Sequence, residues 1–124
     1  MIKHFISTVV CTLFLMVALV AQALDIDSTR AAAERGDFAA QMAIGAFYRH
    51  GMGVPQSDTE AAKWYLKAAT QGDAGAQTNV GMLYLTGQGV NQDEEKAKSW
   101  LRKAAKQGDS SAQRQLKMMS KSSK

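Results

Sequence analysis

Cysteine, histidine and proline are scarce in this chain. Its 124 residues include one cysteine, one proline and two histidines. The cysteine, Cys11, lies in an apolar N-terminal run, so a chain without that run has no disulfide, no thiol nucleophile and no thiolate metal ligand. A zinc site would then need several carboxylates around His50, and nothing in the sequence suggests such a cluster. We therefore expect no metal and no cofactor.

The apolar run is part of a predicted secretory signal. Met1–His4 is a short basic start, Phe5–Val20 is almost entirely apolar, and Ala21-Gln22-Ala23 places small residues where a signal peptidase reads them. The run is shorter than the roughly 20 residues of a comfortable bilayer crossing. We expect a signal peptide at residues 1–23 and an exported protein, periplasmic or secreted, without stable membrane insertion after cleavage. An uncleaved membrane anchor is the alternative.

The basic excess of the chain is small. The net charge is +4 for the whole chain and +3 without Lys3. Acidic and basic residues are interleaved until a lysine-rich end at Lys117, Lys121 and Lys124. A basic protein can bind nucleic acid or an anionic membrane. A solvated surface with a lysine-rich end explains this mild excess better, so we expect no nucleic-acid partner.

The chain contains an internal repeat with a step of 36 residues. Residues 37–72 and 73–108 align without a gap and share 16 identities. Gly-Asp and Ala-Gln pairs recur at the same step, at Gly36-Asp37, Gly72-Asp73, Gly108-Asp109, Ala40-Gln41, Ala76-Gln77 and Ala112-Gln113. A period of this length is typical of repeat proteins whose units stack on one another.

Each unit is predicted to form two helices. Apolar residues recur with the helical period in the first helix (Ala40, Ile44, Phe47 and Tyr48; Ala76, Val80, Leu83 and Tyr84) and in the second (Ala61, Trp64 and Ala68; Ala97, Trp100 and Ala104). Gly51 and Gly87 are expected to end the first helices through a positive φ. Ser57 and Glu60 have the spacing of a capping box. In each Gly-Asp pair, the glycine is expected to close one helix and the aspartate to cap the next.

These patterns predict an all-α fold of six helices, a short α-solenoid of two full helix-turn-helix repeats. The repeat domain spans 24–120, with repeats at about 37–72 and 73–108, half-repeat capping helices at 28–36 and 109–120, and a polar tail at 121–124. Because roughly three repeats are usually needed for independent stability, we expect modest stability, raised by a bound partner or by formation of a homodimer.

The motifs of the repeat resemble a known family. Gly-x-Gly-Val, Ala-x-x-Trp, Lys-Ala-Ala-x-x-Gly-Asp and Ala-Gln, at a 36-residue step, resemble the Sel-one-like repeat, a relative of the tetratricopeptide repeat. The resemblance covers essentially all of residues 24–124. It implies a right-handed α-solenoid used as a protein–protein scaffold, with bacterial members linked to signalling, envelope processes and host-cell contact. A secreted branch of the family carries paired cysteines, which residues 24–124 lack, so that branch's activities are not carried over.

No residue of the repeat domain is a convincing catalyst. His50 is replaced by Thr86 at the equivalent position, so a solvated side chain explains it better than catalysis. Glu94 and Glu95 open a helix, where negative charge suits the helix dipole. Trp64 and Trp100 share one repeat position and are predicted to lie between helices instead of stacking on a ligand. Gly45 and Gly81, inside helices, are expected where a helix approaches an aromatic ring closely. We expect no enzymatic activity.

A variable strip on the first helices is the candidate binding surface. Its side chains are expected on the face opposite the apolar stripe, where related tetratricopeptide arrays have their concave surface. Methionines there can repack around a partner, and arginines can pair with acidic groups. The alternative is that these are ordinary surface residues. The strip consists of Met42, Ala46, Arg49, Thr78, Met82, Leu85, Arg114 and Met118.

The sequence is compatible with three functions. The first is an exported module that binds a periplasmic, envelope or host protein. The second is a periplasmic immunity or inhibitor protein that neutralises a secreted toxin or enzyme. The third, a weak hydrolase, would depend on His50.

Overall fold

The computed structural model describes residues 2–122, except for the side chains of His4 and residues 18–25. Within this range the chain forms six α-helices and no strand. They are α1 (Ile2–Glu34), α2 (Phe38–His50), α3 (Asp58–Thr70), α4 (Ala74–Thr86), α5 (Glu94–Lys106) and α6 (Ser110–Ser122). The predicted all-α solenoid is confirmed.

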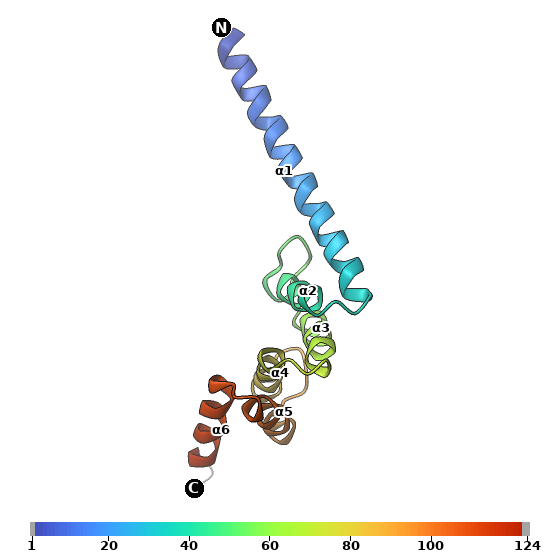
Figure 1. The fold of residues 1–124 in the computed structure, drawn as a ribbon. Coiled ribbons are helices and arrows are strands. Elements are labelled where there is room, and N and C mark those ends of the chain that lie inside the picture. The colour runs from blue at the N-terminus through green and yellow to red at the C-terminus, as the bar shows by residue number, and fades with distance from the viewer. Residues whose placement is uncertain (1, 123–124) are drawn as a thin grey trace.

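The helices pack in chain order. Each helix lies mainly against the next one, so α3 is placed between α2 and α4, and α5 between α4 and α6. Figure 1 shows α2 to α6 following one another along an arc, while the N-terminal part of α1 projects away from the array. Consecutive packing is the arrangement expected for stacked repeats.

The first helix is longer than predicted. The expected separate helix at 28–36 is the C-terminal end of α1, which runs without interruption from Ile2 to Glu34. The reason is that no glycine or proline precedes Gly36 in the sequence, so nothing breaks the helix earlier. The predicted cleavage point after Ala23 therefore lies inside α1. None of the helices in the described part of the chain is long and apolar enough to cross a membrane.

The last helix also extends further than expected. It continues to Ser122, so Lys121 and Ser122 are helical and do not belong to a polar tail. Residues 123 and 124 lie outside the described part of the chain.

Helix ends follow the predicted chemistry. Gly51 and Gly87 cap α2 and α4 in the left-handed region, with φ of 65° and 71°. A side-chain oxygen of the aspartate in each Gly-Asp pair accepts a hydrogen bond from a backbone N–H three residues later. The distances are 2.7 Å for Asp37, 2.9 Å for Asp73 and 2.8 Å for Asp109. These bonds satisfy donors that the first helical turn leaves open.

Only half of the predicted capping box forms at the start of α3. Ser57 Oγ accepts from the Glu60 backbone N–H at 3.2 Å, as expected. The return bond is absent, because the Ser57 backbone N–H donates to the Tyr48 carbonyl at 2.8 Å and the Glu60 carboxylate pairs with Lys63 instead. The loop therefore fastens the start of α3 to the end of α2.

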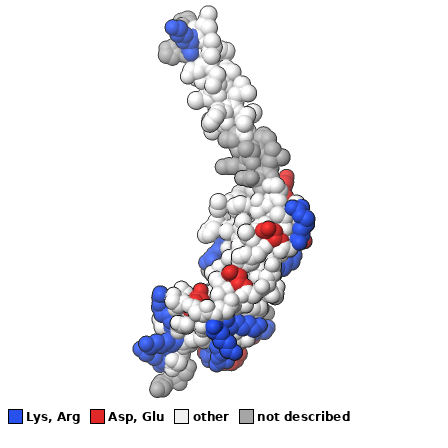
Figure 2. All heavy atoms as spheres, viewed as in Figure 1, with Lys and Arg blue, Asp and Glu red and all other residues white. Residues whose placement is uncertain are grey.

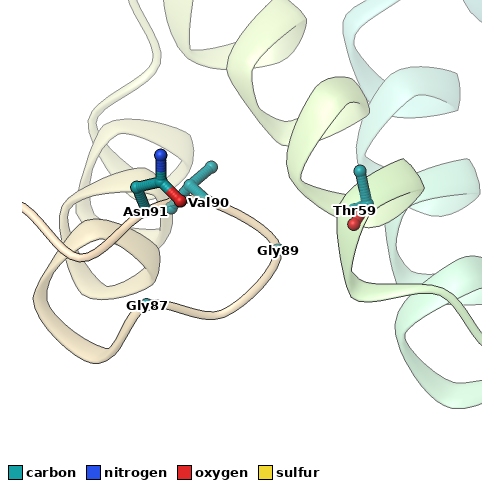
Figure 3. Close-up of a pocket in the computed structure, with 5 residues that line it drawn as sticks. All are labelled: Thr59, Gly87, Gly89, Val90 and Asn91. Carbon is teal, nitrogen blue, oxygen red and sulfur yellow. The ribbon is translucent and has the colours of Figure 1, made fainter.

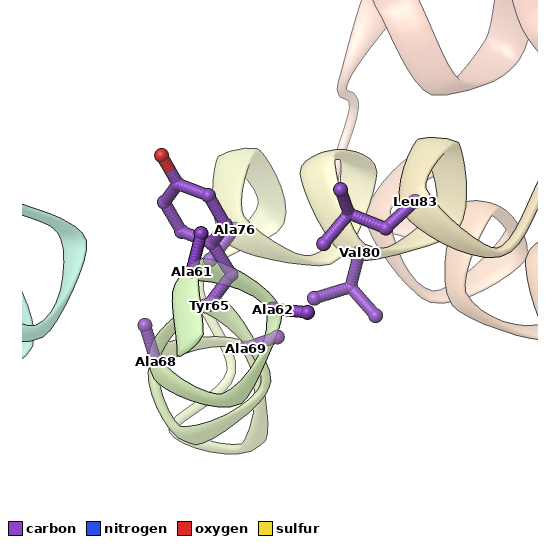
Figure 4. Packing of buried hydrophobic residues seen from close by; sticks show 8 residues of the cluster. All are labelled: Ala61, Ala62, Tyr65, Ala68, Ala69, Ala76, Val80 and Leu83. Carbon is purple, nitrogen blue, oxygen red and sulfur yellow. The ribbon is translucent and has the colours of Figure 1, made fainter. Parts of the chain in front are cut away.

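Small side chains dominate the interface between α3 and α4. Figure 4 shows four alanines of α3 and Ala76 of α4 beside the larger Tyr65, Val80 and Leu83. Alanines allow two helices to approach closely because they add little beyond the backbone. A separate cluster between α1, α2 and α3 contains buried Trp64 packed with Ala33, Ala40 and Ile44. The predicted core role of Trp64 is therefore confirmed. Trp100 is half-buried and packs against the cluster of α3 and α4.

The two helical glycines lie where helices approach most closely. A Cβ added at Gly45 would lie 2.7 Å from Tyr65 Cε1, so the expected aromatic neighbour is present. At Gly81 the neighbour is Leu101, whose Cγ would lie 2.7 Å away. The predicted close approach is confirmed at both sites, but the aromatic partner is wrong for Gly81. Any side chain of suitable shape can fill the space that a missing Cβ leaves.

Candidate binding surface

The predicted strip divides into exposed and half-buried residues and one buried residue. Arg49, Arg114 and Met118 are exposed, and Met118 is 50% exposed. Ala46 and Met82 are half-buried, and with Met118 they occupy one equivalent position on α2, α4 and α6. This position therefore presents a side chain to solvent from each first helix.

Three strip residues take part in packing within the array. Met42 is half-buried against the cluster of α3 and α4. Leu85 is half-buried against a cluster of buried residues in α5 and α6, which consists of Leu101, Ala104, Ala112 and Met119. Thr78 is only 8% exposed, and its Oγ1 has no hydrogen-bond partner among the described residues. The accessible strip is consequently narrower than the predicted set. The assignment of these residues to partner binding remains a prediction.

Two arginines connect neighbouring helices through tyrosines. The Arg49 guanidinium lies close to the Tyr65 hydroxyl, where α2 meets α3. Burial raises the pKa of Tyr65 above its ordinary value of 10.0, and the nearby Arg49 offsets part of that rise. Arg30 Nη2 donates to the Tyr48 hydroxyl at 3.2 Å and links α1 to α2. Arg49 thus contributes to packing as well as to surface charge.

A glutamine network crosses each joint between repeats. Gln71 Nε2 donates to the Gly36 carbonyl at 3.0 Å and to Gln41 Oε1 at 2.8 Å. In the next repeat, Gln107 Nε2 donates to the Gly72 carbonyl at 2.8 Å and to Gln77 Oε1 at 2.9 Å. Gln41 and Gln77 are buried. The network was not predicted, although Gln71 and Gln107 recur at the 36-residue step and were therefore visible in the sequence.

An open hollow lies between the loop after α4 and the start of α3. Its volume is about 470 Å³, and it is lined by Thr59, Gly87, Gly89, Val90 and Asn91. Figure 3 shows Asn91 and Thr59 on opposite sides of it. It contains none of the predicted strip residues, and its lining offers no titratable side chain.

The residues with catalytic potential remain dispersed. His50 is exposed at the end of α2. In the described part of the chain, no three histidine, cysteine or acidic side chains come together as metal ligands. The tryptophan faces are occupied by lysines, with Lys67 Nζ 4.2 Å from the Trp64 ring centroid and Lys103 Nζ 4.4 Å from that of Trp100. Neither ring is thus presented as an open platform for stacking.

Comparison with protein families identifies the repeat. The model of the Sel1 repeat matches residues 38–73 and 74–109, which agree within one residue with the repeats predicted from the sequence. No curated protein matches the chain.

Solved structures of similar fold are also repeat proteins. A Sel1 repeat protein from Oxalobacter formigenes is 43% identical with a TM-score of 0.70, over 73% of this chain and 26% of that one. A protective antigen of uropathogenic Escherichia coli with an SLR fold is 44% identical with a TM-score of 0.67, over 70% and 19%. Helicobacter pylori cysteine rich protein B is 26% identical with a TM-score of 0.66, over 70% and 65%. The chain therefore matches about a quarter and a fifth of the first two proteins.

Proposed function

Because the chain belongs to the Sel1 repeat family, whose repeats generally mediate protein–protein interaction, we propose that it is an exported, non-enzymatic module that binds another protein along its first helices. The observation that carries this proposal is the equivalent position of Ala46, Met82 and Met118. The residue is alanine in α2 and methionine in α4 and α6, while the neighbouring positions Gly45/Gly81 and Tyr48/Tyr84 are identical in the two full repeats. All three side chains are at least partly accessible. Variation at accessible positions of a regular array is what a specific partner requires.

The N-terminal part of α1 supports export. Large apolar side chains that are exposed cluster in residues 2–17, including Phe5 at 73% and Phe14 at 77%. Apolar surface of this kind is unfavourable in water unless it is removed or covered. A cleaved signal peptide accounts for it, and α1 contacts the first repeat near its other end, at Ile26, Arg30 and Ala33.

The binding surface is tested with glutamate substitutions. The chain carrying Ala46→Glu, Met82→Glu and Met118→Glu is used to recover partners by crosslinking from the envelope fraction, beside the wild type. A matched control carries Thr59→Glu, Thr70→Glu and Ser99→Glu, all at exposed, uncharged positions of the second helices. We expect the wild type and the control to recover the same dominant protein and the strip variant to lose it. Equal recovery by all three would contradict the assigned surface.

Export is tested by the N-terminus of the purified protein. We expect the exported chain to begin at Leu24, with the cytoplasmic precursor retaining Met1. A full-length protein that stays in the membrane fraction would support the uncleaved anchor instead.

The identity of the recovered protein separates an adaptor from an immunity or inhibitor protein. A toxin or enzyme that the chain inactivates would indicate immunity, and a non-toxic envelope or host protein would indicate an adaptor. Recovery of the chain itself, with a doubled mass in solution, would indicate a homodimer. A His50→Ala variant with unchanged phenotype closes the hydrolase alternative.

A further inference from the structure

Positive charge is concentrated at the C-terminal end of the array. Residues 101–122 contain six lysines and arginines and one acidic residue, whereas acidic residues outnumber basic ones in residues 24–100. Figure 2 shows lysine and arginine side chains gathered over the end where α5 and α6 lie. All six are exposed. We call them the basic end: Arg102, Lys103, Lys106, Arg114, Lys117 and Lys121.

No residue of the basic end forms an ion pair within the described residues. The ion pairs of the chain involve Lys63, Lys96 and Lys98, none of which belongs to it. The acidic residue nearest in sequence, Asp109, is used to cap α6. Unpaired like charges on adjacent helices repel each other.

The helix dipole explains the cations at the helix ends but not those in the middle of α6. Lys103 and Lys106 lie in the last turn of α5, and Lys121 in the last turn of α6, where positive charge is favourable. Arg114 and Lys117 lie in the middle of α6 and gain nothing from either end. With Met118 and Lys121 they are spaced i, i+3, i+4 and i+7, which places them on one face of the helix.

Seven of the ten acidic side chains that the structure describes cap helices or pair with lysines, which leaves only Asp27, Glu34 and Asp58, so a second copy is a poor partner for the basic end. Four aspartates cap helices, at Asp37, Asp73, Asp93 and Asp109. Glu60 pairs with Lys63, and Glu94 and Glu95 pair with Lys98. A dense acidic surface that matches the basic end is therefore better supplied by a different molecule.

The surroundings of the positive charge favour a protein over nucleic acid. Met118 is 50% exposed among the cations of α6 and offers a flexible apolar contact. Bases stack on open aromatic rings, but α6 has none and the Trp100 face is covered by Lys103. Resting on the proposed function, we infer that the basic end binds an acidic segment of another protein, with an apolar residue of that segment against Met118.

The test measures binding of a defined acidic peptide to the purified chain. The probe is a labelled peptide of glutamates with one leucine, compared with a peptide in which glutamine replaces each glutamate. We expect the acidic peptide to bind and the glutamine peptide to fail. Affinity should fall steeply when ionic strength rises well above about 0.15 M, because exposed charge pairs are screened. Equal binding of both peptides would overturn the proposal.

Charge reversal locates the site. The variant Arg114→Glu, Lys117→Glu, Lys121→Glu should weaken binding of the acidic peptide at least about tenfold. The control Arg35→Glu, Lys63→Glu, Lys67→Glu changes the net charge by the same amount at positions outside α5 and α6 and should retain most of the affinity. Circular dichroism establishes that both variants are folded. Met118→Ser should weaken the leucine-containing peptide more than an all-glutamate peptide. Equal loss in the control would show that only net charge matters and would reject the site.

Two further probes separate other classes of ligand. Vesicles of phosphatidylglycerol and phosphatidylcholine, or a DNA duplex, that bind more tightly than the acidic peptide and lose binding in the reversed variant would overturn a protein partner. A natural partner recovered by the crosslinking described above must also bind the reversed variant more weakly. If the partner binds the reversed variant as tightly as the wild type, the basic end is not its binding site, while the proposed function stands. If no partner is recovered, the proposed function itself fails.

Discussion

The two full repeats have matching helices and caps, but equivalent glycines meet different neighbours. In the repeat at 37–72, Gly45 faces the Tyr65 ring and Gly53 faces the flexible end of Ile26. In the repeat at 73–108, Gly81 faces Leu101 and the Ala97 carbonyl, and Gly89 packs directly onto the Asp58 backbone. The glycines are required by the path of the backbone. The atoms that fill the space beside the glycines differ between the repeats. In the second repeat some of them are backbone atoms, so it tolerates an added Cβ less well than the first.

The largest expected effect comes from Gly89→Ala. Its φ is +71°, which an alanine adopts at a cost of roughly 1–2 kcal/mol, and the new Cβ would collide with the Asp58 carbonyl group. We expect the free energy of unfolding to fall by about 3 kcal/mol in urea titrations followed by circular dichroism.

Gly53→Ala is the matched substitution in the first repeat. Its φ is +70°, but the obstacle is the end of the Ile26 side chain, which can rotate away. We expect a loss of about 1–2 kcal/mol, mainly from the backbone conformation. Equal losses for the two variants would show that the contact with Asp58 does not distinguish the repeats.

Alanine substitutions at the two helical glycines, Gly45 and Gly81, should differ less in their effect on stability than those at Gly53 and Gly89. Overpacking costs about 1–3 kcal/mol, and alanine recovers about 1 kcal/mol of helix propensity. Gly81→Ala should be the more destabilising, by a net loss of about 1–2 kcal/mol, because the branch point of fully buried Leu101 and the Ala97 carbonyl both obstruct the Cβ. Gly45→Ala should cost about 1 kcal/mol. Thermal and urea unfolding of both variants measure the difference.

Gly75→Ala in α4 is the control for helix propensity. Its Cβ would meet only an Asp73 carboxylate oxygen at 3.2 Å, and the site is exposed. A small gain in stability is expected there. If Gly81→Ala also stabilised the protein, the close approach of α4 and α5 would be less strict than its geometry indicates.

The glutamine network should contribute equally in the two repeats. Gln107→Ala removes the donor for the Gly72 carbonyl and Gln77 Oε1, and Gln71→Ala does the same for Gly36 and Gln41. We expect losses of about 1 kcal/mol for each variant. Gln88→Ala, at an exposed loop position, should have almost no effect. A double-mutant cycle of Gln77 and Gln107 that shows no coupling would count against the network.

Much of the fold could be predicted from the sequence because its causes are local. Caps such as Asp73 and turns such as Gly87 act within a few residues, and the 36-residue period shows which positions are equivalent. The fusion of the first half-repeat into α1 is not predicted, because the apolar pattern of residues 5–20 indicates a signal peptide and does not show where a helix begins. The failed return bond of Glu60 depended on Lys63 and on the carbonyl of Tyr48, which compete for the same groups.

The binding strip was predicted less well because helical angle alone does not determine exposure. The positions of Met42 and Leu85 are half-buried where a neighbouring helix covers them. The angular position of a residue around its own helix does not show which face a neighbouring helix covers. At the equivalent position, Ala46 and Met82 are also half-buried and Met118 is exposed, but none of the three packs against a buried cluster. The basic end was visible as a lysine-rich end, but the absence of ion pairs at it could be seen only in the structure.

The smallest expected effect is a gain in stability, and it concerns the strip residue that is least accessible. Thr78 is the second-repeat equivalent of Met42 and has a buried hydroxyl without a partner among the described residues. Thr78→Val keeps the branched shape and removes the unpaired polar group, so we expect a gain of about 0.5–1 kcal/mol. Thr86→Val in the same helix is the control, because the exposed Thr86 hydroxyl donates to the Met82 carbonyl at 2.9 Å and its removal should not stabilise. If Thr78→Val instead left stability unchanged and weakened binding of the partner, the hydroxyl would be used by the partner, and the accessible strip would extend into the joint between the repeats.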